Sequence, residues 1–264
     1  MKLNRNSWLA AGASLLLAFV AQPAAQAAQV LYNTGDLILA FRATGGQGAN
    51  ESLLVNIGAP STYANATGSF DLSIGSIGAD LVTQYGSNWY ERTDLSWSIF
   101  GGNDTALPNA TIYGSRAQIP YGTEATAWNA LTNNAHRAST RNFIQGVASA
   151  FDGLEALTNP YAALQTNSSD ATSYYQQVGV GSNDFGALSQ WTSIEGSFGA
   201  GSEALNLFRL TSTTTNLGTF TISDAGVVSF STPAAVPEPS KTVFAMLGVG
   251  ALFLRRRRVA ALPA

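Results

Sequence analysis

The segment Thr219-Phe-Thr-Ile-Ser-Asp-Ala-Gly-Val-Val-Ser-Phe230 decides the fold class of this chain. Apolar and hydroxyl side chains alternate on both sides of its Asp-Ala-Gly loop, which is the period-two pattern of a half-buried strand. The loop glycine stands where a three-residue hairpin loop needs a left-handed backbone. The pattern predicts an antiparallel hairpin in which Ile222 faces Val228 and Phe220 faces Phe230 on the core side.

Further strands are expected on both sides of the middle of the chain, because short apolar runs there are bounded by Gly, Pro and Asn. These strands cover 36–42, 52–57, 95–100, 110–115 and 205–210. In the first of them, Leu37, Leu39 and Phe41 share one face.

Two helical regions are expected between these strands. Residues 79–90 read as a short helix, and its buried side would consist of Leu81, Val82, Tyr85 and Trp89. Residues 123–157 show the clearest helical spacing, and the polar patch at 139–141 could split them into two helices. The fold class is therefore α+β, a mostly antiparallel β-sheet domain with mid-sequence helices.

The N-terminus has the three parts of a secretory signal peptide. Lys2 and Arg5 give a positive start, residues 8–21 are apolar apart from one serine, and Ala25 and Ala27 form a small-x-small cleavage pattern. Removal is expected after Ala27. The alternative is a permanent N-terminal anchor, but the apolar stretch is short for a membrane span.

The C-terminal region also has three parts in a fixed order. Pro237, Glu238 and Pro239 form a stiff, extended peptide because proline fixes φ and pushes its predecessor toward extended geometry. The uncharged run 242–254 would rise about 20 Å as a helix, which is short of a hydrocarbon core of about 30 Å. The arginine cluster that follows would hold its end on the cytoplasmic side. That cluster consists of Arg255, Arg256, Arg257 and Arg258. By these properties alone, a processed tail and a permanent tail anchor stay equally open.

This order of Pro-Glu-Pro, short apolar helix and arginine cluster resembles a PEP-CTERM sorting signal. The resemblance covers roughly the last thirty residues, and it implies temporary anchoring in the inner membrane of a bacterium with an outer membrane. It further implies cleavage near the Pro-Glu-Pro motif by an exosortase, a membrane-embedded cysteine protease, and export to the cell surface. Residues 259–264 extend beyond the point where such tails often stop. Segments 35–46 and 80–89 look like those of other uncharacterised PEP-CTERM proteins.

The resulting domain plan has five parts. They are a signal peptide at 1–27, an exported α+β domain at 28–231, a proline-containing linker at 232–241, a short C-terminal transmembrane helix with the arginine cluster at 242–258, and a tail at 259–264.

Composition limits what the exported body can do. Residues 28–235 hold six basic and fifteen acidic residues, a net charge of −9, and they contain no lysine. Such a body repels nucleic acid and anionic lipid surfaces. The chain has no cysteine, which excludes disulfides, thiol catalysis and thiolate metal sites.

Catalytic groups are sparse. His136 is the single histidine, and its position beside Arg137 indicates a solvated helix face. The closest carboxylate pairs are Glu91 with Asp94 and Asp152 with Glu155, and the second pair could share a helix face. We expect no catalytic, cofactor-binding or metal-binding residue.

Two weaker ligand ideas remain. Calcium could bind at 103–104 or 183–184, although no EF-hand loop is present. Carbohydrate could stack on an exposed aromatic side chain, with Trp191 in its Gly/Ser-rich setting as the first candidate.

The sequence therefore predicts a non-enzymatic exported protein of the cell surface or extracellular matrix. Its expected partners are signal peptidase, an exosortase-type protease and, before processing, the membrane, with extracellular polysaccharide as a further candidate and no nucleic acid. One alternative is a carbohydrate-binding module or a carboxylate-based glycosidase. Another alternative is a permanently tail-anchored envelope protein.

Overall fold

The computed structural model describes residues 28–103, 110–179, 185–186, 193–199 and 204–233. The strands are β1 Leu37–Ala43, β2 Glu51–Gly58, β3 Phe70–Asp71, β4 Leu95–Gly102, β5 Ile112–Ala117, β6 Ala162–Thr166, β7 Gly196–Ser197, β8 Ala204–Leu210, β9 Thr214–Ile222 and β10 Val228–Ser231. The helices are α1 Pro60–Ala64, α2 Gly78–Tyr85 and α3 Asn134–Asp152, with a 3-10 turn η1 at Trp89–Glu91 and a π-helical turn η2 at Tyr175–Gly179.

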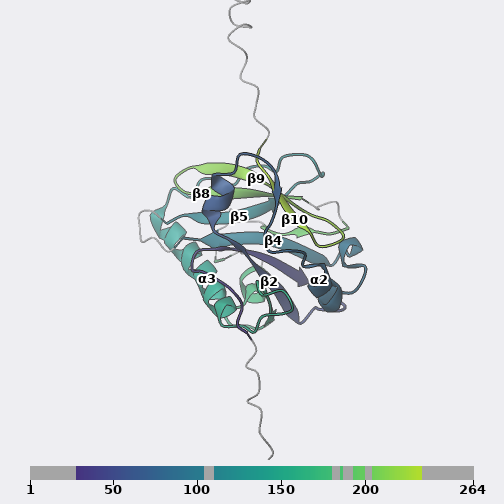
Figure 1. The fold of residues 1–264 in the computed structure, drawn as a ribbon. Helices are drawn as coiled ribbons and strands as arrows, with labels where there is room; N and C mark the ends of the chain where they lie inside the picture. The colour runs from purple at the N-terminus through teal and green to yellow at the C-terminus, as the bar shows by residue number, and fades with distance from the viewer. Residues whose placement is uncertain (1–27, 104–109, 180–184, 187–192, 200–203, 234–264) are drawn as a thin grey trace, which may run out of the picture.

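All of these strands belong to one sheet. Its order is β3-β10-β9-β8-β5-β4-β1-β2-β6, and β7 pairs with β4 beside this path. Every pairing is antiparallel. The sheet curls into a half-barrel and carries the few helices around it (Figure 1). The predicted mostly antiparallel α+β architecture is therefore confirmed at this level.

The hairpin at 219–230 forms in the predicted register. Ile222 pairs with Val228 and Phe220 pairs with Phe230, and the two phenylalanine rings lie 4.9 Å apart between centroids. Gly226 has a φ of 73°. A Cβ atom there would lie 2.3 Å from the backbone nitrogen of Gly78, so the loop packs directly on the start of α2.

The sheet is buried on both faces, because each face has a core of its own. Alternate residues of β1 point to opposite sides: Leu37, Leu39 and Phe41 join a core with α2, whereas Ile38 and Ala40 join a core with α3. We call these the α2-side core and the α3-side core. All residues of β1 and β4 are buried as a result, so β1 is covered on the opposite face as well as on the face that Leu37, Leu39 and Phe41 share.

The long helical prediction for 123–157 is wrong at both ends. Residues 123–133 are not helical, and α3 begins at Asn134 and ends at Asp152 as one unbroken helix. Backbone groups in this stretch bond to side chains of the sheet instead: the Ala125 amide donates to Asn206 Oδ1 (2.8 Å), and Arg116 donates to the Thr126 carbonyl (2.8 Å). Ala125, Trp128 and Leu131 of this stretch are nevertheless buried in the α3-side core.

The short helix also ends earlier than predicted. α2 stops at Tyr85, where Gly86 follows with a φ of 93°, and Trp89 lies in the separate turn η1. Leu81 and Tyr85 face the core, but Val82 is 43% exposed and does not belong to the buried side.

The described chain begins and ends at opposite ends of the domain (Figure 1). Its first residues bond to the segment after α3, where the Val30 amide donates to the Leu154 carbonyl (3.0 Å), whereas β10 pairs with β9 and β3 near the other edge of the sheet. No helix among the described residues is long and apolar enough to cross a bilayer. The predicted signal peptide and C-terminal helix lie outside the described residues.

Candidate functional site

A row of polar side chains crosses the α3-side face of the sheet. Its members are Gln165 on β6, Ser52 on β2, Arg42 on β1, Ser96 on β4 and Ser197 on β7, and each is paired in register with the next. Directly paired residues project from the same face of a sheet, so these five side chains form one line. We call this line the polar row.

Arg42 at the centre of the polar row forms a buried ion pair with Glu195. Its Nε donates to Glu195 Oε1 (3.1 Å) and its Nη2 donates to Oε2 (2.5 Å). The two side chains are only 9% and 10% exposed. Bidentate geometry and burial make this a strong, specific contact between β1 and the residue just before β7.

Two hydroxyl groups complete the arrangement around Glu195. The Tyr174 hydroxyl donates to Glu195 Oε1 (2.9 Å), and Ser98 Oγ lies 2.6 Å from the same hydroxyl. A phenol has one proton, so Ser98 donates to the Tyr174 oxygen. Ser98 and Tyr174 are completely buried.

The environment favours a protonated Tyr174 and a charged Arg42. Burial raises the pKa of Tyr174 well above its usual range, and the Glu195 carboxylate adds to this shift. Burial lowers the pKa of Arg42, but the hydrogen bonds and charge of Glu195 outweigh it, so the net pKa is raised. The Tyr174 phenol and the Arg42 guanidinium thus both donate hydrogen bonds to the Glu195 side chain.

Gln165 and Ser52, the members of the polar row on the β6 side of Arg42, also form hydrogen bonds to neighbouring segments. Gln165 accepts from the Tyr174 amide (2.7 Å) and donates to the Thr172 carbonyl (3.2 Å), and Ser52 donates to Asn167 (2.9 Å). The polar row therefore holds the segment that follows β6 against the sheet. None of its members could be found from the sequence, because they come from five strands separated along the chain.

The predicted carboxylate pairs do not form paired acids in a cleft. Asp94 is bound by Arg92 in a bidentate contact (2.9 and 2.7 Å), and these hydrogen bonds lower the pKa of Asp94, while Glu91 is exposed. Asp152 is the last residue of α3, and Glu155 lies beyond it in a main-chain bridge with Gln29. The expectation that Asp152 and Glu155 share a helix face is therefore wrong.

The remaining candidate residues are placed as follows. His136 is exposed in the first turn of α3. Within the described ranges, no group of three or more His, Asp or Glu side chains is arranged to hold a metal ion. Asn103 accepts a hydrogen bond from the Thr111 amide (2.9 Å), and its predicted partner Asp104 lies outside the described residues, as do residues 183–184.

The described tryptophans are core residues. Trp89, Trp97 and Trp128 are at most 3% exposed, and the Arg116 guanidinium lies 4.7 Å from the ring centroid of Trp128. Trp191 lies outside the described residues. Tyr90 is another of the aromatic residues that could supply a stacking platform, and its side chain is half-buried.

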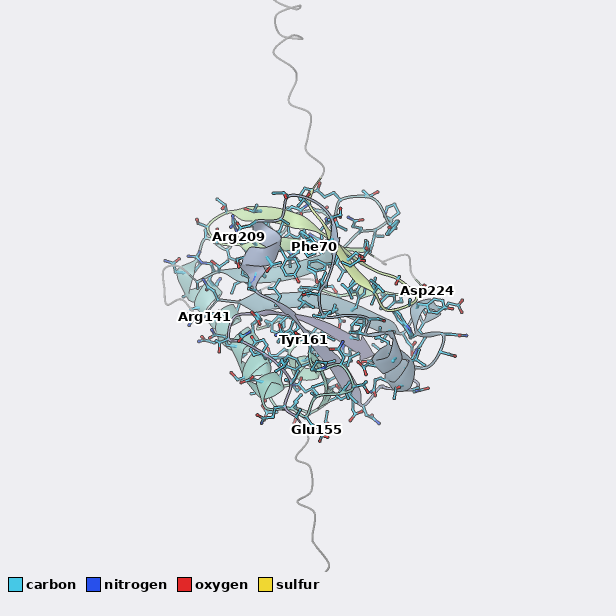
Figure 2. All side chains as sticks on the ribbon, in the orientation of Figure 1. Phe70, Arg141, Glu155, Tyr161, Arg209 and Asp224 are labelled. Atoms are coloured by element: carbon cyan, nitrogen blue, oxygen red, sulfur yellow. The ribbon has the colours of Figure 1, made fainter. Side chains whose placement is uncertain are left out.

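Tyr90 lines a cleft of about 270 Å³ at the turn of the β9–β10 hairpin. Phe198 and Ile222 supply further apolar wall, and Ser223 and Asp224 supply a hydroxyl and a carboxylate. Figure 2 shows Asp224 at the outer edge of the domain, on the turn between β9 and β10. An apolar wall beside a few polar groups is the usual composition of a small-ligand site.

Two other clefts are more polar. One, of about 280 Å³, lies between the β1–β2 loop and α2 and is lined by residues 46–51, Thr83 and Gln84. The other, of about 190 Å³, lies between α3 and residues 32–35, and includes Tyr32 and Asp152. Burial raises the pKa of Tyr32 to about 12, and the charge of Asp152 is a smaller contribution in the same direction.

The residues with the most specific sequence signal lie outside this description. They are the cleavage alanines Ala25 and Ala27, the motif Pro237, Glu238 and Pro239, and the four arginines 255–258. Comparisons of this chain with protein-family models, with curated proteins and with solved structures find no match.

Proposed function

We propose that this protein is an exported component of the cell surface or extracellular matrix, delivered through a cleavable C-terminal tail of the PEP-CTERM type. One observation carries the proposal: Pro-Glu-Pro, a thirteen-residue uncharged run and four arginines follow one another in that order. Each part has a physical role. The Pro-Glu-Pro motif gives an extended peptide that a protease groove can bind, the uncharged run forms a helix just long enough to enter the bilayer, and the arginines keep its end on the cytoplasmic side.

The position of the fold relative to the tail supports this proposal. The last strand, β10, ends at Ser231, and the residues of both cores lie between Val30 and Phe230. Cleavage near Pro237 would therefore remove no core residue of the described domain. A stable body would be released, and its surface of hydroxyl and amide groups with a net charge of −9 suits an aqueous or polysaccharide environment.

The arrangement of the body's charged groups favours a structural or binding role over catalysis. Arg42, Glu195 and Tyr174 hold distant segments on the sheet, and Arg92 binds Asp94 together with the carbonyl groups of the β1–β2 loop. These contacts hold loops in place, and the charged groups that form them are already bound to other protein groups.

Mass spectrometry of the C-terminus of the protein recovered from its native cells tests the proposal. The expected product ends near Pro237, and deletion of the exosortase should leave full-length protein in the membrane fraction. Replacing Pro237 and Pro239 by Ala should also block cleavage, whereas the flanking substitutions Pro233→Ala and Pro263→Ala should not. Mature molecules that still end at Ala264 would refute the proposal and favour a permanent tail anchor.

Carbohydrate binding is a second candidate, and the cleft at Tyr90 is the observation that favours it. A half-buried tyrosine beside a carboxylate can contact the apolar face of a sugar ring and bond to its hydroxyl groups. A glycan array would detect such binding. Tyr90→Ala should abolish it and Tyr121→Ala, at an exposed tyrosine outside the cleft, should not; an unchanged signal in Tyr90→Ala would rule out this site.

A further inference from the structure

Two strongly exposed apolar side chains lie at one tip of the domain. Among the described residues, the exposed large hydrophobic side chains are Ile119 (72%), Tyr121 (59%), Leu31 (53%) and Val82 (43%). The first two flank the exposed Pro120, so residues 119–121 form a contiguous apolar tip, whereas Leu31 and Val82 stand alone. Single exposed apolar residues need no explanation, but a cluster at a loop tip indicates a contact surface.

This 119–121 tip lies beside the point where the chain leaves the fold. Gln118 donates to Thr219 Oγ1 (3.3 Å), and Ser231 pairs with the same Thr219 in the β9–β10 ladder. Figure 1 shows the teal loop after β5 and the end of the described chain on the same side of the domain, next to β9.

The length of the linker then limits how the domain can stand on a membrane. Residues 234–241 separate the described fold from the uncharged run, and eight residues span at most about 30 Å. A compact domain of roughly 200 residues has a radius of gyration of about 17 Å and is about 40 Å across. The exit point cannot lie on the far side of such a body, so the half of the domain that carries it faces the bilayer.

We propose that the 119–121 tip contacts the lipid surface while the chain is still held by its tail. This inference rests on the proposed tail anchor, because without a tether nothing brings the tip to the membrane. Tyrosine is enriched at membrane interfaces, where its ring lies among apolar atoms and its hydroxyl group stays in water.

The occupant that the charges favour is a lipid surface contacted through apolar atoms. Residues 117–123 carry no charge, and the body as a whole is strongly acidic, so electrostatic attraction to anionic lipid is absent. The contact should therefore be weak without the tether and should change little with salt. It would hold the linker at a constant distance from the bilayer, where a membrane-embedded protease acts.

A fluorescent probe on the full-length chain, reconstituted through its own tail into vesicles of phosphatidylcholine and phosphatidylglycerol, tests this contact. The chain has no cysteine, so Thr123→Cys next to the tip gives a single labelling position. Glu155→Cys is the matched control, because Glu155 lies at the opposite end of the domain (Figure 2). Quenchers on the lipid chains should reduce the fluorescence of a dye at 123 and leave a dye at 155 unchanged.

Substitutions at the tip separate a specific contact from mere proximity. Ile119→Ser with Tyr121→Ser should reduce quenching at 123 to the level seen at 155, whereas Val82→Ser should not change it and Tyr121→Trp should preserve it. Equal thermal melting of these variants would show that they are folded. Equal quenching at 123 and 155, or quenching that survives the double substitution, would overturn the proposal.

The same experiment separates the two proposals from one another. A chain that floats with the vesicles but shows no quenching at 123 refutes the tip contact and leaves the sorting function intact. A chain that does not float with the vesicles refutes the tail anchor and the tip contact together. Quenching at 123 in a chain that cells never cleave would support the tip contact and reject the processing.

Discussion

Glu195→Gln should destabilise the domain strongly. In the wild type, Glu195 Oε1 accepts from both Arg42 Nε and the Tyr174 hydroxyl, and Oε2 accepts from Arg42 Nη2. The oxygen of the new glutamine can still accept from Arg42 Nε and from the Tyr174 hydroxyl. The NH₂ group of the glutamine, however, then faces Arg42 Nη2, so that two donors meet. The Arg42 charge also stays buried without a counter-charge.

The expected loss follows from the burial of the pair. Removing one partner of a buried ion pair costs about 3–5 kcal/mol, and the side chains of Arg42 and Glu195 are only 9% and 10% exposed. For a domain of this size, a loss of 1 kcal/mol lowers the melting temperature by roughly 2–4 °C. A fall of about 6–20 °C is therefore expected from these values.

Asp94→Asn is the matched control, because it makes the same carboxylate-to-amide change beside another bidentate arginine. The Asp94 side chain is 37% exposed, and exposed pairs contribute about 0–1 kcal/mol. Urea unfolding of residues 28–235, followed by tryptophan fluorescence, measures both losses. Added salt should weaken the effect at Asp94 and not that at Glu195, since buried pairs are screened less. A loss of unfolding free energy below about 1 kcal/mol for Glu195→Gln would refute the inference that the buried Arg42–Glu195 ion pair stabilises the domain.

Three further outcomes are expected for the same domain. Gly226→Ala should cost more than the roughly 1–3 kcal/mol of backbone strain alone, because its Cβ would collide with the start of α2; Gly35→Ala, with a similar φ and nothing within 4 Å of its Cβ, is the control in urea unfolding. Asn133→Ala should cost about 1 kcal/mol, because the Asn133 side chain caps two amides of the first turn of α3, and the loss would appear as faster hydrogen exchange there. Arg92 lowers the folded-state pKa of Asp94, so the ion pair stabilises the fold above about pH 4, and this stabilisation disappears as the pH falls through the folded pKa. The stability difference between wild type and Asp94→Asn should therefore vanish in acid. A difference that stays constant with pH would contradict the ion pair.

The cleft at Tyr90 shows why a ligand site is harder to predict from the sequence than a candidate sorting signal. Tyr90, Phe198 and Asp224 line one cleft although more than a hundred positions separate the first from the other two. No local pattern joins them. The Pro-Glu-Pro motif and the arginine cluster, in contrast, lie within one continuous segment of the sequence, so a proposal about them can be made from neighbouring residues.

The sequence by itself predicted β1, β2, β4, β5, β8 and the closing β9–β10 hairpin, because alternation and a turn glycine act over a few residues, but it did not predict β3, β6 or β7. The pairing of Phe220 with Phe230 followed directly from the loop length. It did not determine which buried residues would be helical: Trp128 and Leu131 are buried in a stretch whose backbone bonds to the sheet. Only the tertiary structure decided that β1 is covered on both faces and that Arg42 meets Glu195, since burial and charge pairing depend on which distant segments cover a strand.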